Sequence, residues 1–222
     1  MEEKTVLKKH QKNFLALVLK EPYLLKNFYW TGGTVLSEIY LKHRESQDID
    51  LFSEKEIHLP SINKFVGIAG KKLKAKKITH RRYLGLHSYT LKLLTNELKV
   101  DFNYYPFPRI NKGKKWHGLA VDSLEDIAAN KIHTISTKPR ERDFVDIYFI
   151  MKKENYSLRK LIDLARAKFD WPIDPIQLGQ SFTEAVIYKD IPKLLVPLER
   201  KDMENFYLKL ARSLKKEIFK TK

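Results

Sequence analysis

Two aspartates separated by one residue are the first feature of this 222-residue chain that could support chemistry. Asp48 and Asp50 flank Ile49 in a segment, residues 48–52, that alternates charged and apolar residues, as a half-buried strand does. Side chains two apart in a strand point to the same face, so the two carboxylates are expected to lie together. Paired carboxylates can share hard divalent cations, and such cations bridge triphosphate oxygens. The spacing therefore predicts a metal site for a triphosphate.

A glycine turn precedes the aspartate pair. Gly32, Gly33 and Thr34 follow a short aromatic strand, residues 28–30, and open a helical segment, residues 35–42. Glycines let the backbone approach a phosphate closely, and the start of a helix presents free N–H groups and the positive end of the helix dipole. The turn and the carboxylates together predict one triphosphate–metal site.

A third carboxylate interrupts a later apolar strand. Asp101 lies in residues 97–104, and it supplies a third metal ligand if that strand lies beside the one that carries Asp48. Such a ligand would position the metal ion that activates an attacking hydroxyl. Each feature alone has an ordinary explanation: a Gly-Gly turn is often only a turn, Asp-X-Asp is common in exposed strands, and Asp101 can face water. Their order along the chain favours the functional interpretation.

The remaining pattern predicts an α/β (α+β) fold in two domains. Residues 1–120 form a mixed-sheet domain that contains an antiparallel hairpin, and residues 121–222 form a helical C-terminal domain. An irregular loop is expected where Pro106, Pro108 and Gly113 fall. The hairpin strands are residues 86–94 and 97–104, and the helices are residues 6–20, 61–77, 123–135, 140–153, 158–169, 176–188 and 200–219.

The order of glycine turn, Asp-X-Asp pair and later strand carboxylate resembles the nucleotidyltransferase superfamily. A longer stretch is similar to the first motif of the AbiEii/AbiGii toxin family, the nucleotidyltransferase-like toxins of bacterial abortive-infection and toxin–antitoxin systems. The resemblance covers residues 28–150 and implies a nucleotidyltransferase-like sheet domain. In the first motif it rests on Gly32-Gly33-Thr34, Leu36, Tyr40, His43-Arg44, Ser46 and Asp48-Ile49-Asp50-Leu51-Phe52.

The family also carries a helix lysine and an Asp-X-X-Asp element, which match Lys131, Asp143 and Asp146 here. The resemblance implies that Lys131 and Asp146 are catalytic together with Asp48 and Asp50, so that the helical domain contributes to the site. An ammonium suits a triphosphate, although Lys131 could be an ordinary surface lysine. Asp143 and Asp146 share a helix face and could equally form a salt-bridged pair, and the role of Asp143 stays open.

The implied triphosphate contacts include two residues just before the aspartate pair. Arg44 and Ser46 either touch phosphate or pin the loop in place. The implied metal is Mg²⁺ or Mn²⁺, held by Asp48, Asp50 and Asp101. The nucleotide-binding residues are Gly32, Gly33, Thr34, Arg44, Ser46 and Lys131.

The chain is strongly basic, with 43 Lys and Arg against 27 Asp and Glu, a net charge of +16. Basic clusters at residues 71–83 and 109–116 suit the phosphates of a nucleic acid, and their aromatic residues suit unpaired bases. Solvated basic faces are the alternative, and an anionic membrane surface is a second candidate partner. The absence of cysteine excludes disulfides, thiolate metal sites and thiol nucleophiles.

A cytoplasmic location without membrane attachment is expected, because the apolar N-terminal stretch is short and is broken by Lys20, Glu21 and Pro22. The seven histidines show no metal-ligand spacing.

The expected function is metal-dependent transfer of a nucleotide from a nucleoside triphosphate to an acceptor. The resemblance implies an RNA acceptor, the 3′ end of tRNA, and a phage-defence toxin held in check by an antitoxin protein. Two alternatives stay open: a catalytically weak module on the same fold that binds RNA or a partner, and another Asp-X-Asp metal enzyme such as a nuclease or a glycosyltransferase.

Overall fold

The computed structural model describes residues 5–188 and 191–218 and divides the chain into two compact units. Unit 1 comprises Met1–Tyr40 and Ser46–Ser123, and unit 2 comprises Leu41–Glu45 and Leu124–Lys222. The sequence predicted a boundary between residues 120 and 121. The division of the structure follows Ser123 and also assigns the short segment Leu41–Glu45 to the helical unit.

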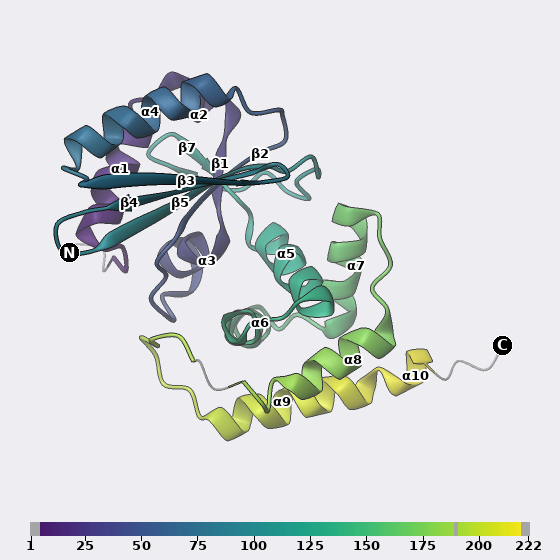
Figure 1. Ribbon diagram of the computed structural model, residues 1–222. Helices are drawn as coiled ribbons and strands as arrows, with labels where there is room; N and C mark the ends of the chain where they lie inside the picture. Colours follow the sequence, from purple (N-terminus) through teal and green to yellow (C-terminus); the bar gives the residue numbers. More distant parts are fainter. Residues whose placement is uncertain (1–4, 189–190, 219–222) are drawn as a thin grey trace. The chain divides into compact units, whose positions relative to one another are not determined.

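Unit 1 is built on a mixed sheet, with seven strands in the described residues (Figure 1). Their order is β3-β4-β5-β2-β1-β7-β6. Neighbouring strands are parallel in the β2–β5 and β1–β7 pairs and antiparallel in the others. The strands are β1 (Tyr29–Thr31), β2 (Ile49–Ser53), β3 (Lys77–Tyr83), β4 (Leu86–Lys92), β5 (Glu97–Tyr104), β6 (Lys115–Trp116) and β7 (Leu119–Val121).

The helices of unit 1 leave part of the sheet uncovered. Helices α1 (Lys9–Val18) and α4 (Leu59–Lys72) pack against each other through Phe14 and Phe65, whose ring centroids are 5.6 Å apart. They cover the face on which the apolar side chains of β5 lie, and Leu98, Val100 and Phe102 are fully buried there. The alternate side chains of β5, which include Asp101, point to the opposite face.

Three further helical segments complete this unit: α2 (Pro22–Asn27), α3 (Gly32–Val35) and a π-helix, η1 (Leu36–Leu41). The sequence predicted that Pro22 ends the first helix. Pro22 also begins α2, because proline is well tolerated in the first turn, where its missing N–H has no partner to lose.

The helix predicted over residues 61–77 ends at Lys72, and the strand β3 was missed. Every residue of β3 is exposed, so the strand has no alternation of buried and exposed positions, and the lysines just before it extend the pattern of a basic helix. Backbone pairing with β4 and a left-handed residue, Lys74 (φ 55°), separate the two elements.

The irregular loop predicted where Pro106, Pro108 and Gly113 fall is followed by two short strands, β6 and β7, which were not predicted. The strand β7 pairs in parallel with β1 through Tyr29 and Trp30. Strands of two or three residues are too short to show a periodic pattern, so this pairing could not be predicted from the sequence.

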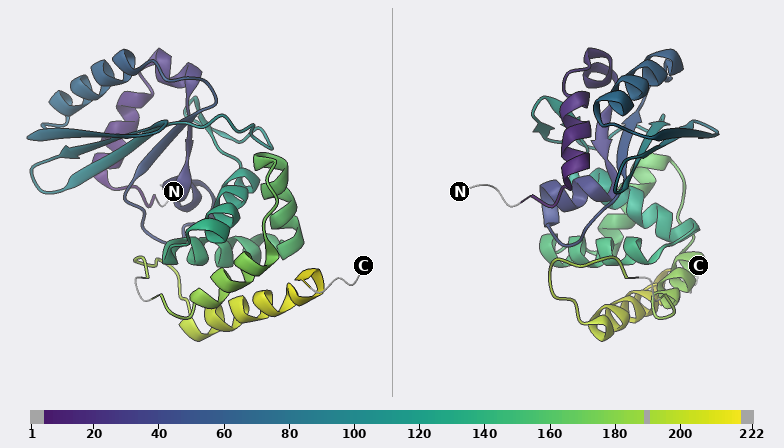
Figure 2. Two further views of the ribbon diagram at one scale, coloured as in Figure 1. Left: turned by 45° about the vertical axis from the view of Figure 1, so that its right-hand side comes forward. Right: turned by 60° about the vertical axis from the view of Figure 1, so that its left-hand side comes forward.

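Unit 2 is helical. Helices α8 and α9 pack side by side (Figure 2), and a fully buried ion pair joins α7 to α5, with Lys168 Nζ 2.7 Å from Asp126 Oδ1. The helix predicted over residues 176–188 ends at Glu184. The helix predicted over residues 200–219 is divided into two helices, and residue 219 lies outside the described residues. The helices are α5 (Leu124–Thr137), α6 (Glu141–Glu154), α7 (Leu158–Phe169), α8 (Pro175–Glu184), α9 (Arg200–Ser213) and α10 (Lys215–Ile218). Across the described ranges, no helix has the length and apolar character needed to cross a bilayer.

Candidate active site

The register of the sheet brings two of the predicted metal ligands side by side. Asp50 on β2 is the direct partner of Asp101 on β5, and on its other side Asp50 faces Thr31 of β1. Directly paired residues share a face of the sheet, so both carboxylates point away from the covered face. Asp48 comes one residue before β2 and is half-buried.

The glycine turn fits tightly against the aspartates of β2 and β5. Gly32 is the first residue of α3 and has φ +80°, a left-handed conformation that L side chains rarely adopt. A Cβ at this position would overlap the Asp50 carboxylate. This position therefore requires glycine, both for the backbone conformation and for the close approach of Asp50.

Thr34 ties the start of α3 to the aspartate pair. Its buried hydroxyl donates a hydrogen bond to the backbone carbonyl oxygen of Asp48. The predicted nucleotide-binding turn is thus attached to Asp48, the first residue of the aspartate pair, and the two features form one local structure.

A lysine that the sequence did not single out lies among the carboxylates. Lys99 Nζ donates to Asp101 Oδ2 at 2.8 Å and lies 3.5 Å from Asp48 Oδ2. Burial alone lowers the pKa of Lys99, but the hydrogen bond with Asp101 and the charges of the three aspartates raise that pKa above its usual value. Asp48, Asp50 and Asp101 therefore act together on one cation position.

The carboxylates offer a partial fit for a divalent cation. Oxygen donors are the ligands that Mg²⁺ and Mn²⁺ prefer, and the buried Oδ1 of Asp101 has no hydrogen-bond partner among the described residues. In the described part of the chain, however, no group of three or more His, Asp or Glu side chains is arranged to hold a metal ion. The ammonium of Lys99 lies at the position where their charges converge, so metal binding there requires Lys99 to move.

Unit 2 contains the other predicted site residues in a buried ionic cluster around Asp146. Arg44 binds Asp146 through two donors, with Nε 2.6 Å from Oδ1 and Nη2 2.8 Å from Oδ2. Lys131 Nζ lies 2.7 Å from Oδ2, and His43 Nε2 lies 2.8 Å from Oδ1. Burial alone would raise the pKa of Asp146, but the charges of Lys131 and Arg44 hold it well below its usual value.

Asp143 shares Lys131 with Asp146. Lys131 Nζ donates to Asp143 Oδ1 at 2.7 Å, and Arg140 Nε donates to Asp143 Oδ2 at 2.9 Å. The charges of Lys131 and Arg140 lower the pKa of Asp143 against the opposing effect of burial. Both aspartates of the Asp-X-X-Asp element thus orient the same ammonium group, and Lys131 is buried rather than an ordinary surface lysine.

Three of these contacts were not foreseen. Lys99, His43 and Arg140 were not among the predicted site residues, although Lys99 stands two residues before Asp101 in a strand and so shares its face. That spacing was a usable signal. His43 belongs to the family motif, but nothing in the sequence predicted its contact with Asp146, which spans 103 residues. Arg44, expected to touch phosphate or pin the loop, binds Asp146, and the carbonyl oxygen of Ser46 accepts a hydrogen bond from Gln11.

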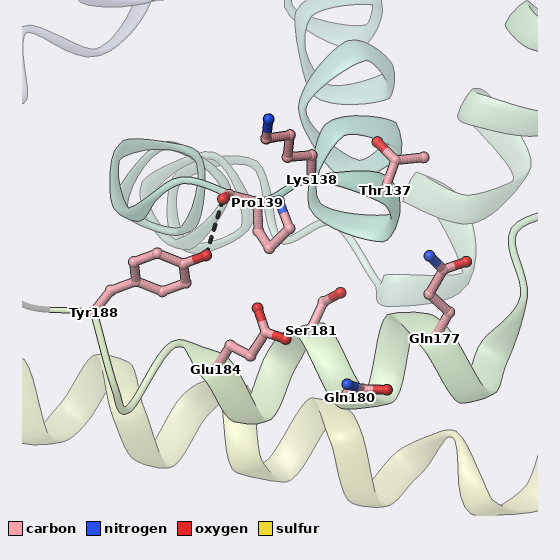
Figure 3. Close-up of a pocket in the computed structure, with 8 residues that line it drawn as sticks. All are labelled: Thr137, Lys138, Pro139, Gln177, Gln180, Ser181, Glu184 and Tyr188. Atoms are coloured by element: carbon pink, nitrogen blue, oxygen red, sulfur yellow. Dashed lines mark hydrogen bonds between the residues drawn. The ribbon is translucent and has the colours of Figure 1, made fainter.

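Unit 2 also has a pocket of about 400 Å³ that contains none of the predicted site residues (Figure 3). The hydroxyl of Tyr188 donates to the carbonyl oxygen of Pro139 at its edge, at 3.0 Å. The lining residues are Thr137, Lys138, Pro139, Gln177, Gln180, Ser181, Glu184 and Tyr188.

Comparison with known proteins identifies relatives over most of the chain. A family model described as nucleotidyl transferase AbiEii toxin, type IV TA system, matches residues 14–220. An uncharacterized protein of Aquifex aeolicus (strain VF5) is 30% identical over 167 residues, which cover 73% of this chain and 76% of that protein.

Two solved structures share the fold. A proposed nucleotidyltransferase from H. pylori has a TM-score of 0.59 at 19% identity, over 96% of this chain and 97% of its own. JHP933 from Helicobacter pylori has a TM-score of 0.58 at 19% identity, over 95% and 90%. These likenesses confirm the nucleotidyltransferase-like fold that the glycine turn and the aspartates predicted. Because the family model spans nearly the whole sequence, the chain belongs to the nucleotidyl transferase AbiEii toxin family of type IV toxin–antitoxin systems.

Proposed function

We propose that this protein transfers a nucleotide from a nucleoside triphosphate to a hydroxyl of RNA, at the 3′ end of tRNA, and that it acts as a toxin restrained by a cognate antitoxin. One observation carries the chemical part of this proposal. Asp48 and Asp101 hold one cation, the Lys99 ammonium, and Asp50 lies beside Asp101 in the sheet and against the glycine turn.

The residues of unit 1 would act by position and charge. Asp48, Asp50 and Asp101 would hold Mg²⁺ or Mn²⁺, which when bound neutralises triphosphate charge and activates the acceptor hydroxyl. Gly32, Gly33 and Thr34 would place the triphosphate. The acceptor oxygen forms a bond to the α-phosphorus as the bond to the β-bridging oxygen breaks, pyrophosphate leaves with that electron pair, and the hydroxyl proton passes to solvent.

The role of unit 2 in catalysis is proposed from the family motif. Lys131 would contact phosphate, and Asp146 and Asp143 would fix the orientation of its ammonium through the hydrogen bonds described above. Arg44, which binds Asp146 with two donors, supports that arrangement. Contacts of Arg44 and Ser46 with phosphate stay predictions.

The RNA acceptor is supported by charge. The excess of 16 positive charges suits a polyanion, and a type IV toxin–antitoxin family supports an antitoxin as a second partner.

The proposal is tested by incubating the protein with total cellular RNA, Mg²⁺ and each α-labelled nucleoside triphosphate in turn. A labelled band of tRNA size with the wild type, and none with an Asp48→Ala, Asp50→Ala double variant, supports it. Triphosphate binding without labelled RNA would contradict the RNA acceptor and point to a protein or a small molecule instead.

One observation favours the alternative of a catalytically weak binding module. The ammonium of Lys99 already pairs with Asp101 and Asp48, two of the three carboxylates on which metal binding would depend. If neither triphosphate nor metal binds, while RNA does, the module becomes the better account.

A further inference from the structure

The strand at the edge of the sheet presents a basic and aromatic strip on the face that carries the carboxylates. In the sheet register Arg81 of β3 pairs with Ser88 of β4, and Ser88 pairs with Asp101 of β5. Because paired residues share a face, Arg81, Ser88, Asp101 and Asp50 form one row across four strands. Neighbouring strands are about 4.8 Å apart, so the backbone at Arg81 lies roughly 10 Å from that at Asp101.

The rest of this face of β3 and β4 has a consistent chemistry. Tyr83 lies on the same face as Arg81, two residues further along, and is 75% exposed. Neither strand contains an Asp or a Glu. We define the outer strip as the side chains on this face of the two strands: Lys77, Thr79, Arg81, Tyr83, Leu86, Ser88, Thr90 and Lys92.

Arg81 has no competing role in the described part of the protein. Its guanidinium makes no ion pair or hydrogen bond with the described residues, and it lies on a strand whose residues are all exposed. Its neighbour Arg82 points to the opposite face, where His80 stacks on Tyr89 with 4.3 Å between ring centroids and the side chain of Ile78 lies against Gly70 of α4. The two arginines thus have the same charge and exposure but lie on different faces.

We propose that the outer strip binds the single-stranded end of the RNA acceptor, with Arg81 contacting a backbone phosphate and Tyr83 stacking on an unpaired base. This inference rests on the proposed function, because the row from Arg81 to Asp50 would lead the acceptor strand to the carboxylates. A guanidinium binds phosphate with two donors, and an exposed aromatic ring stacks on bases that are not paired. Hydroxyl groups of Thr79, Ser88 and Thr90 add neutral hydrogen-bonding partners for sugar and phosphate.

The test compares Arg81→Gln and Tyr83→Ala with the matched control Arg82→Gln. For each variant, two quantities are measured: binding of a fluorescent single-stranded RNA oligonucleotide by anisotropy across a salt series, and the KM values for RNA and for nucleoside triphosphate in the transfer assay. Arg81→Gln should weaken RNA binding and raise the KM for RNA roughly ten-fold, the loss expected for one charge-assisted contact, with the KM for triphosphate unchanged. It should also reduce the slope of log affinity against log salt by about 0.7.

Arg82→Gln should change each quantity by less than two-fold, whereas Tyr83→Ala should weaken binding without changing the salt slope. Equal effects of the two arginine variants, or none, would overturn the inference, since charge alone would then explain RNA binding. The RNA-binding measurement distinguishes a failure of this inference from a failure of the proposed function. RNA binding that depends on Arg81, without nucleotide transfer, supports the strip and contradicts the enzyme, and transfer to a protein with no RNA binding overturns the strip.

Discussion

Lys99 is the residue that would most directly oppose the proposed metal binding. Its ammonium donates to Asp101 and lies 3.5 Å from Asp48, so a cation entering the row must displace it. Its side chain is 43% exposed and can leave toward solvent. We therefore expect Lys99→Met to bind Mn²⁺ several-fold more tightly than the wild type in the absence of nucleotide, as measured by titration calorimetry.

Lys92→Met is the matched control for this measurement, because Lys92 lies on the same face of the neighbouring strand and has no contact with the aspartates among the residues described. Its affinity for Mn²⁺ should equal that of the wild type. Unchanged or weaker binding by Lys99→Met would show that Lys99 does not compete with the metal.

Gly32 is the residue whose small size the site requires. In Gly32→Ala the new methyl group would overlap the Asp50 carboxylate, and an alanine would have to adopt φ +80°. We expect a loss of stability of about 1–3 kcal/mol, the usual range for a strained left-handed residue, together with loss of nucleotide transfer. Thermal unfolding and the transfer assay measure the two effects.

Gly67→Ala provides the comparison, since a Cβ at this position in α4 meets nothing within 4 Å. That variant should be as active as the wild type and at least as stable, because alanine is the better helix former. A Gly32→Ala protein that behaves like Gly67→Ala would contradict the close approach of Asp50.

At the scale of elements, the ionic cluster between α5, α6 and residues 41–45 should contribute strongly to stability. Asp146→Asn would leave Lys131 and Arg44 without their shared carboxylate and should destabilise the protein by roughly 3–5 kcal/mol at pH 7. Because the pKa of Asp146 is lowered in the folded state, this contribution is present above the pKa of the unfolded state, about 4. It is lost as the pH falls through the pKa of the folded state. The difference between wild type and variant should therefore shrink at acidic pH.

Urea unfolding from pH 7 down to pH 2.5 measures that difference. Asp163→Asn serves as the control, because Asp163 forms an exposed pair with Arg159 that should contribute less than about 1 kcal/mol. A constant difference between wild type and Asp146→Asn across this range would mean that the charge of Asp146 does not stabilise the fold.

The elements also show what the sequence could and could not predict. Strands β2, β4 and β5 were predicted because each has one buried and one polar face, which produces a period of two. The strand β3 was missed because both of its faces are exposed. The sequence predicted that Asp50 and Asp101 lie side by side only if their two strands pair, because strand pairing depends on contacts far apart in the chain.

At the scale of the whole molecule, the chain passes between its two units more than once, since residues 41–45 belong to unit 2 and are flanked by segments of unit 1. No local pattern in the sequence marks such a segment. Two of its residues, His43 and Arg44, bind Asp146. Family membership was nevertheless recognisable, because the glycine turn and the aspartate pair are close together in the sequence.

The central claim, transfer of a nucleotide to RNA, is tested most directly by following two labels on one triphosphate. The protein is incubated with Mg²⁺, tRNA and the preferred nucleoside triphosphate, labelled in parallel reactions at the α- or the γ-phosphate. We predict that the α-label enters the RNA while the γ-label leaves as pyrophosphate, and that Asp50→Asn abolishes both. Entry of the γ-label into RNA, or α-label transfer that persists in Asp50→Asn, would contradict the account.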